Sequence, residues 1–94
     1  MTRDLLIEML DHTTGVDKDG ASWQTKSEHK MQFYVGTPGQ SLLLPMITRC
    51  QLEERYAVLS SRENGTQHYV PIEHISAFSL RVPEEGQQRR PGFA

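Results

Sequence analysis

The chain has 94 residues, a formal net charge of −2 and one cysteine. This length predicts one domain with a single core and too little interior for an elaborate active site. The slight negative charge argues against an electrostatic binder of nucleic acid, and one cysteine excludes an intrachain disulfide or a paired-thiol zinc site.

The sequence contains no segment that predicts insertion into a membrane. No apolar run approaches the roughly 20 residues that span a bilayer, and Met1-Thr2-Arg3-Asp4 does not begin a signal peptide. We therefore expect a cytoplasmic protein with no membrane partner, in which Cys50 is a small buried apolar residue.

The first predicted element is a helix over residues 2–12. Thr2 suits the N-cap position. Four apolar side chains fall in one stripe along this helix: Leu5, Leu6, Met9 and Leu10. Because about three helical turns are marginally stable alone in water, we expect the stripe to pack against a sheet or another subunit.

Residues 16–28 are predicted to form a polar loop, with strands beginning at about residue 21. The string Asp17-Lys18-Asp19-Gly20 has the composition of a calcium loop. The EF-hand spacing would nevertheless place Gly15 and Lys26 at the first and last ligand positions, where neither supplies a carboxylate. An Asp-Gly turn before a strand around Trp23 explains the string better.

The middle of the chain predicts strands. From residue 31 to residue 35, apolar and polar side chains alternate as in a half-buried strand. Residues 41–52 form a longer apolar run interrupted by Pro45, which lacks the backbone N–H of a sheet ladder. Pro45 is therefore predicted at an edge, a bulge or a bend that carries the strand from one sheet layer to the other.

Residues 56–82 are predicted to contain a hairpin, a short bend and a final strand. The Asn64-Gly65 pair between two apolar runs predicts a tight turn, with Gly65 in the left-handed conformation. A β-branched residue there is expected to cost roughly 1 kcal/mol or more. Residues 1–82 form the predicted domain, and residues 83–94, which lack an apolar period, are predicted to be a disordered C-terminal tail.

The strand at Tyr56-Ala57-Val58-Leu59, followed by residues 69–78, resembles the Sm-like group of SH3-type barrels, which includes the bacterial Sm-like RNA chaperone. The resemblance implies a mainly β fold, namely a small bent five-stranded antiparallel SH3/Sm-like barrel with a short N-terminal helix. It also implies ring assembly by pairing of the last two strands between subunits, with RNA held around the ring. His74 matches the histidine of the chaperone's lysine-and-histidine segment, but Glu73 stands where a basic residue is expected.

No catalytic motif, phosphate-binding loop or paired metal-ligand motif is present, so we predict no enzyme, catalytic residue, metal or cofactor. Our functional hypothesis is a non-enzymatic β-barrel interaction or regulatory module that forms a homo-oligomer or binds a protein partner. One alternative is an Sm-like RNA-binding protein, which the net charge disfavours. The other is a small histidine-dependent metal-binding protein or enzyme that uses His68 and His74. Candidate partner or RNA contacts are Tyr69, His68, His74, Arg89 and Arg90.

Overall fold

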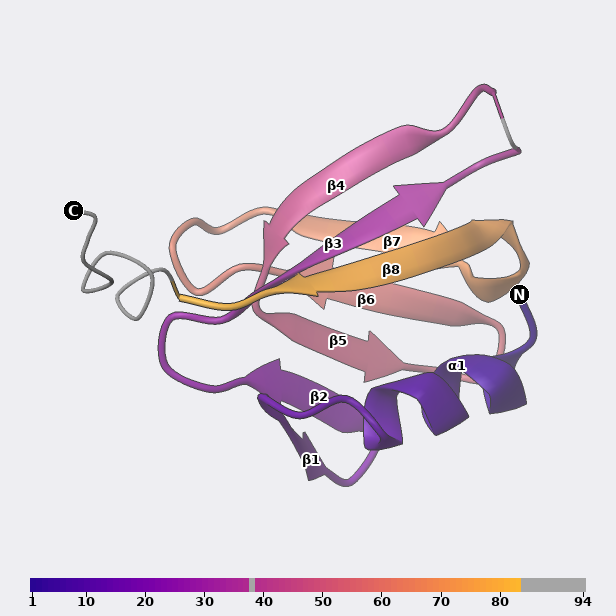
Figure 1. The fold of residues 1–94 in the computed structure, drawn as a ribbon. Coiled ribbons are helices and arrows are strands. Elements are labelled where there is room, and N and C mark those ends of the chain that lie inside the picture. Colours follow the sequence, from indigo (N-terminus) through magenta and orange to yellow (C-terminus); the bar gives the residue numbers. More distant parts are fainter. Residues whose placement is uncertain (38, 84–94) are drawn as a thin grey trace, which may run out of the picture.

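The computed structural model describes residues 1–37 and 39–83 and is mainly β, as predicted (Figure 1). In the described residues the elements are α1 (Arg3–Asp11), β1 (Val16–Asp19), β2 (Ser22–Thr25), β3 (Lys30–Val35), β4 (Leu42–Ile47), β5 (Arg49–Leu52), β6 (Tyr56–Ser60), β7 (Gln67–Pro71), the 3-10 helix η1 (Ile72–His74) and β8 (Ile75–Arg81). Neither helix is long and apolar enough to cross a membrane within these residues. The predicted tail after Pro83 lies outside the described residues.

The strands form two antiparallel sheets. The larger sheet has the order β1-β2-β5-β6-β7, and the smaller has the order β4-β3-β8. The chain passes between the sheets three times: between β2 and β3, at the β4–β5 junction and at η1 (Figure 1). One core of buried apolar side chains receives residues from both sheets and from α1.

The helix begins as predicted, but the side chains that it packs against the sheets differ from the predicted apolar stripe. The Thr2 hydroxyl oxygen accepts a hydrogen bond from the Leu5 backbone N–H at 3.2 Å. Leu6 and Leu10, one helical turn apart, are fully buried, whereas Leu5 is 45% exposed. The predicted position of Leu5 in the packed stripe is therefore wrong, because the i,i+4 row of Leu6 and Leu10 faces the sheets and Leu5 lies beside it.

Polar contacts tie both ends of α1 to the larger sheet. The Arg3 Nε donates to the backbone oxygen of Glu53 at 2.9 Å, near the start of the helix. At the other end, the indole N–H of buried Trp23 donates to Asp11 Oδ1 at 2.9 Å. The predicted docking of the helix is thus accompanied by two hydrogen bonds that fix its direction.

The segment predicted as a polar loop contains a hairpin instead. β1 and β2 pair antiparallel from Val16↔Thr25 to Asp19↔Ser22, and Gly20 in the turn has a φ of 66°. The Asp-Gly turn is confirmed, but the loop prediction is wrong for β1. An edge strand can pair through its backbone without apolar alternation, and β1 is such an edge.

The predicted tight turn at Asn64-Gly65 is wrong. The last β6–β7 pair is Ser60↔Gln67, which leaves the six-residue loop 61–66, and Gly65 does not have a positive φ. Side chains shape this loop: Ser61 Oγ accepts from the Glu63 N–H at 3.1 Å, and Asn64 Oδ1 accepts from the Thr66 N–H at 2.9 Å. A Cβ at Gly65 would meet no atom within 4 Å, so the predicted strain is absent.

Pro45 lies on an edge strand and in a bulge, as predicted. β4 is an edge of the smaller sheet, and its pairing with β3 shifts from Phe33↔Leu44 to Met31↔Ile47. Pro45 and Met46 therefore stand opposite one residue of β3, and Met46 has a φ of 63°. The passage to the other sheet occurs farther on, at Thr48.

The final strand also contains a bulge. Its pairing with β3 shifts from Tyr34↔Ala77 to Val35↔Ile75, so Ser76 is the extra residue. Ile75 is consequently buried while Ala77 is exposed, although the two side chains would point to one face in a strand without a bulge. The structure has eight strands among its described residues because the β1–β2 hairpin and the division of residues 42–52 add to the predicted five.

The packing of α1 predicts that alanine substitutions of two neighbouring leucines change the free energy of unfolding by very different amounts. Leu6→Ala should lower the free energy of unfolding by about 2–5 kcal/mol, because it leaves a cavity in the core. Leu5→Ala, the matched control, should change it by less than about 1 kcal/mol. Urea denaturation followed by circular dichroism measures both. Equal losses would show that the helix does not pack through the Leu6 face.

Candidate functional site

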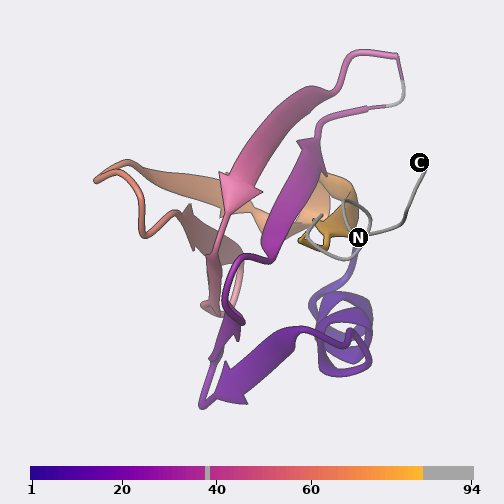
Figure 2. The same cartoon turned by 60° about the vertical axis from the view of Figure 1, so that its left-hand side comes forward.

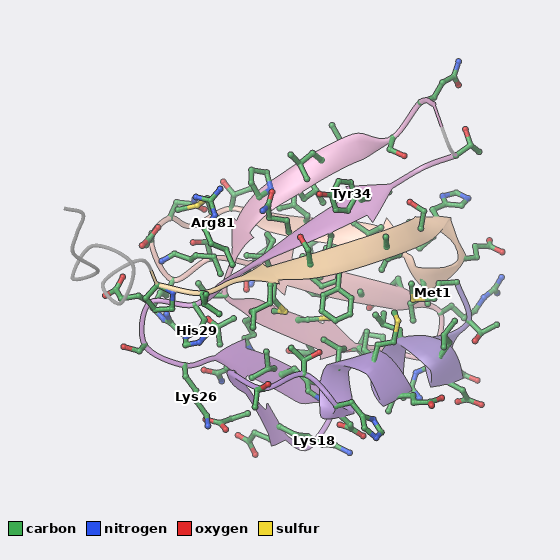
Figure 3. The ribbon with its side chains drawn as sticks, viewed as in Figure 1. Met1, Lys18, Lys26, His29, Tyr34 and Arg81 are labelled. Carbon is green, nitrogen blue, oxygen red and sulfur yellow. The ribbon has the colours of Figure 1, made fainter. Side chains whose placement is uncertain are left out.

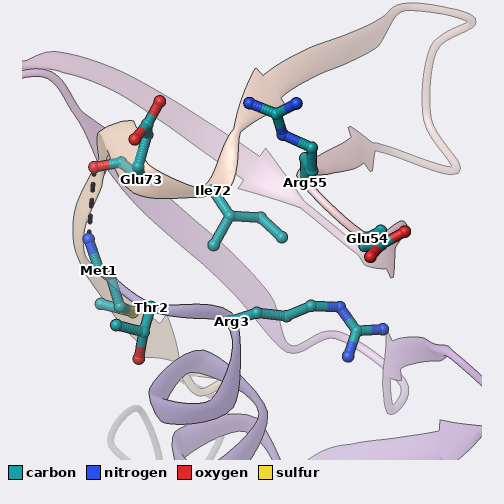
Figure 4. Close-up of a pocket in the computed structure, with 7 residues that line it drawn as sticks. All are labelled: Met1, Thr2, Arg3, Glu54, Arg55, Ile72 and Glu73. Atoms are coloured by element: carbon teal, nitrogen blue, oxygen red, sulfur yellow. Dashed lines mark hydrogen bonds between the residues drawn. The ribbon is translucent and has the colours of Figure 1, made fainter.

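Three separate segments enclose a pocket of about 260 Å³ (Figure 4). They are the start of the chain, the turn between β5 and β6, and η1. The lining residues are Met1, Thr2, Arg3, Glu54, Arg55, Ile72 and Glu73.

Backbone hydrogen bonds hold these segments together. The Ile72 N–H donates to the backbone oxygen of Arg55 at 3.0 Å, which joins η1 to the β5–β6 turn. The Met1 amino group donates to the backbone oxygen of Glu73 at 3.3 Å, which joins η1 to the start of the chain (Figure 4). The side chain of Ile72 is buried and forms the apolar centre of the pocket.

The pocket rim carries charges of both signs. Arg3 and Arg55 contribute guanidinium groups, and Glu54 and Glu73 contribute carboxylates. None of these four side chains forms an ion pair within 4.0 Å in the described part of the chain, where the two ion pairs are Lys26–Asp17 and Lys30–Glu63.

The charges and the volume of this pocket limit the ligands that it could hold. Guanidinium donors fit carboxylate or phosphate oxygens, but the two neighbouring carboxylates oppose a strongly anionic ligand. The volume is below the range of about 300–1,000 Å³ that is typical of small-molecule sites. Among the residues that the structure describes, no serine, cysteine or histidine lines the pocket, and the carboxylates of Glu54 and Glu73 are its side-chain groups that could act as an acid or a base.

The predicted contact residues occupy different surroundings. Tyr69 is 65% exposed on β7, and its ring lies 6.1 Å from that of Tyr56 on β6. His68, the preceding residue, points to the opposite face of the sheet and is half-buried. His74 is exposed in η1, and its backbone oxygen accepts from the Gly36 N–H at 2.7 Å. Arg89 and Arg90 lie outside the described residues.

The structure therefore brings together only part of the predicted set. Tyr69 joins Tyr56 in an exposed aromatic pair, and His74 directly follows Glu73 of the pocket. Among residues 1–37 and 39–83, no group of three histidine, cysteine or acidic side chains could hold a metal ion. His68 and His74 therefore lack the third ligand that their metal hypothesis requires.

Sequence reasoning missed Arg3 and Arg55 as site residues. The pocket gathers residues 1–3, 54–55 and 72–73, so no local spacing in the chain links the three segments. Tyr56 could have been found, because the strand alternation places it on the outer face, opposite the buried Ala57.

Comparisons of this chain with models of protein families, with curated proteins and with solved structures found no match. The Sm-like resemblance therefore stays a prediction, and the functional argument rests on the geometry of the fold.

The buried thiol predicts a pH dependence of stability. Burial raises the pKa of Cys50 from 9.0 to about 12. In the unfolded chain the thiol ionises above about pH 9, so the folded state should lose about 1.4 kcal/mol per pH unit between pH 9 and pH 12. Cys50→Ala should remove this dependence of the folded state's stability on pH.

Urea midpoints of both proteins at pH 8 to 10.5 test the prediction. The difference between the two proteins isolates Cys50, because both contain the same tyrosines and lysines. Curves that run parallel above pH 9 would contradict burial of the thiol.

Proposed function

We propose that this protein is a non-enzymatic interaction module that self-associates by pairing the open edges of β7 and β8 between copies. The observation that carries the proposal is the strand order: β7 ends the larger sheet and β8 ends the smaller one, and each has one neighbour in the described residues. Each strand therefore presents a row of unpaired backbone N–H and C=O groups on its other side.

The path of the chain supports an SH3/Sm-like barrel as the architecture of this module. The consecutive strands β4 and β5 belong to different sheets, as the two halves of one bent strand do in such a barrel. β8 lies beside β3, and only the three residues of η1 separate β7 from β8. In this interpretation the β1–β2 hairpin is an addition at the edge of β5.

The other two sheet edges are poor places for pairing. β1 has only four residues, three of which are charged (Asp17, Lys18 and Asp19). β4 contains Pro45 and a bulge. Charges, proline and bulges are the features by which natural sheets prevent edge-to-edge pairing.

β7 and β8 have fewer of these features, although β8 contains the bulge at Ser76. In β7 the only proline is the last residue, Pro71, and in β8 the only charged residue is the last one, Arg81. Pairing β7 of one copy with β8 of the next is a head-to-tail contact, and such contacts close into rings when the rotation between copies allows it.

RNA binding is the second candidate function. The exposed pair of Tyr56 and Tyr69 favours it, because aromatic side chains stack on unpaired bases. The net charge of −2 and the carboxylates of Glu54 and Glu73 oppose it. Nucleic acid that copurifies with the protein at low salt and raises its absorbance at 260 nm would support this candidate.

Light scattering coupled to size exclusion tests self-association. At micromolar concentration the wild-type protein should be a dimer or a larger closed ring. Ala77→Pro and Phe78→Pro form a matched pair, because successive N–H groups of a strand point in opposite directions, so only one of the two variants removes a donor from the open edge.

The variant that removes a donor from the open edge leaves the β3–β8 ladder intact, so it should keep the wild-type melting temperature. This variant should shift the protein toward monomer. The other variant should lose stability, because it removes a donor from the β3–β8 ladder. A wild-type protein that is monomeric at every concentration would refute the proposal.

A further inference from the structure

We propose that Asn64 is a site of spontaneous covalent modification, at which the backbone nitrogen of Gly65 displaces the side-chain amide nitrogen of Asn64. Asn64 is the only asparagine of the chain, and it lies with Gly65 in the 61–66 loop, where both residues are exposed. This loop, which connects β6 and β7, projects at the left of Figure 2. Water therefore reaches both reacting groups.

The reaction converts the amide of Asn64 into a cyclic imide and then into an acid. The Gly65 nitrogen loses its proton and attacks Cγ of Asn64, so that an N–Cγ bond forms and a succinimide ring closes. The Cγ–Nδ2 bond breaks, and the nitrogen leaves as ammonia, which carries away that proton. Water then opens the ring at either of its two carbonyl groups, which leaves aspartate or isoaspartate at position 64.

The attacking nitrogen is free to react. Within residues 1–37 and 39–83, the Gly65 N–H donates no hydrogen bond. A Cβ built at Gly65 would meet no atom within 4 Å, so the space beside this residue is open. Because glycine has no side chain, nothing on the residue itself hinders the approach of its nitrogen to Asn64.

A hydrogen bond holds the amide of Asn64 in position for the attack. Asn64 Oδ1 accepts from the Thr66 N–H at 2.9 Å. The ring that this hydrogen bond closes contains both Asn64 Cγ and the Gly65 nitrogen, so the reacting atoms are oriented before the reaction begins, which lowers its entropic cost. The same N–H stabilises the negative charge that develops on Oδ1 as the new bond forms.

Contacts to other segments hold the first half of the loop. Glu63 Oε2 accepts from Lys30 Nζ at 2.9 Å, and the side chain of Lys30 is only 9% exposed. The Arg62 guanidinium donates to two backbone oxygens, one at the end of β2 and one just after it. His29 and Arg81, the neighbours of Lys30 in the chain and in the β3–β8 register, are labelled at the same end of the molecule as this loop (Figure 3). The contacts fix the loop while leaving residues 64–66 exposed.

The product differs from the native chain in charge and in backbone length. An acid at position 64 makes the formal net charge of −2 more negative by one and stands next to Glu63. Isoaspartate also routes the backbone through the former side chain, which adds one methylene group to the loop that the Ser60↔Gln67 pair closes. The modification therefore acts at the start of β7. It occurs within one chain and does not depend on the proposed pairing of β7 with β8.

Mass spectrometry of the incubated full chain tests the inference. At pH 8 and 37 °C the wild-type protein should gain about 1 Da, because a hydroxyl group replaces an NH2 group, and peptide mapping should place the gain at residue 64 as a mixture of aspartate and isoaspartate. Gly65→Ala is the matched control, since the added Cβ meets no atom and Gly65 has no positive φ. Its methyl group should slow the reaction at least about tenfold. No gain in the wild type, or equal rates in both proteins, would overturn the inference.

The unfolded chain tests the part that the loop plays. Because the hydrogen bond from Thr66 orients the amide in the folded protein, the folded wild-type chain should react at least as fast as the same chain in concentrated guanidinium chloride at equal pH. A slower reaction in the folded protein would show that the loop protects Asn64, and the inference would then be wrong.

Discussion

The passage of the chain from the smaller sheet to the larger one depends on the hydrogen bonds of one buried residue, Thr48, at the corner between β4 and β5. Its N–H donates to the backbone oxygen of Ser60 at 2.9 Å, and its backbone oxygen accepts from the Thr25 N–H at 2.9 Å. Its hydroxyl oxygen accepts from the Arg62 N–H at 2.8 Å. The Arg62 guanidinium in turn donates to the backbone oxygens of Thr25 and Ser27. One corner thus links β2, β6 and the 61–66 loop, and every buried side-chain nitrogen or oxygen among the described residues has a hydrogen-bond partner.

The sequence predicted those parts of the fold that local chemistry determines. Thr2 was identifiable as a helix cap and Pro45 as an edge or bulge residue, because each property follows from one side chain and its backbone. The turn at Gly65 was not predictable, since Arg62 is tied to Thr48 and Thr25, which are distant in the sequence. The bulges likewise depend on register between strands, and a shift of one residue reverses the faces that alternation assigns.

The candidate site was harder to predict from the sequence than the fold was. Tyr69 and His74 were named from the sequence as contact residues beside the last bend. The aromatic partner of Tyr69 is Tyr56 from β6, and the pocket, which contains Glu73 but not His74, takes Arg3 from the helix. The open edges of β7 and β8 follow from strand order, which no single segment encodes. The function that we propose for this small domain therefore rests on what the fold leaves unpaired, namely the open sheet edges of β7 and β8. The pocket contributes a rim with charges of both signs.

Amide hydrogen exchange at two protein concentrations tests the central claim, that β7 and β8 are paired between copies, most directly. The N–H groups of these strands that face away from β6 and β3 should exchange more slowly at 100 μM than at 1 μM, because pairing protects them. Exchange in β1, whose charged edge stays in solvent, should be the same at both concentrations. Exchange in β7 and β8 that is equally fast at both concentrations would contradict the account.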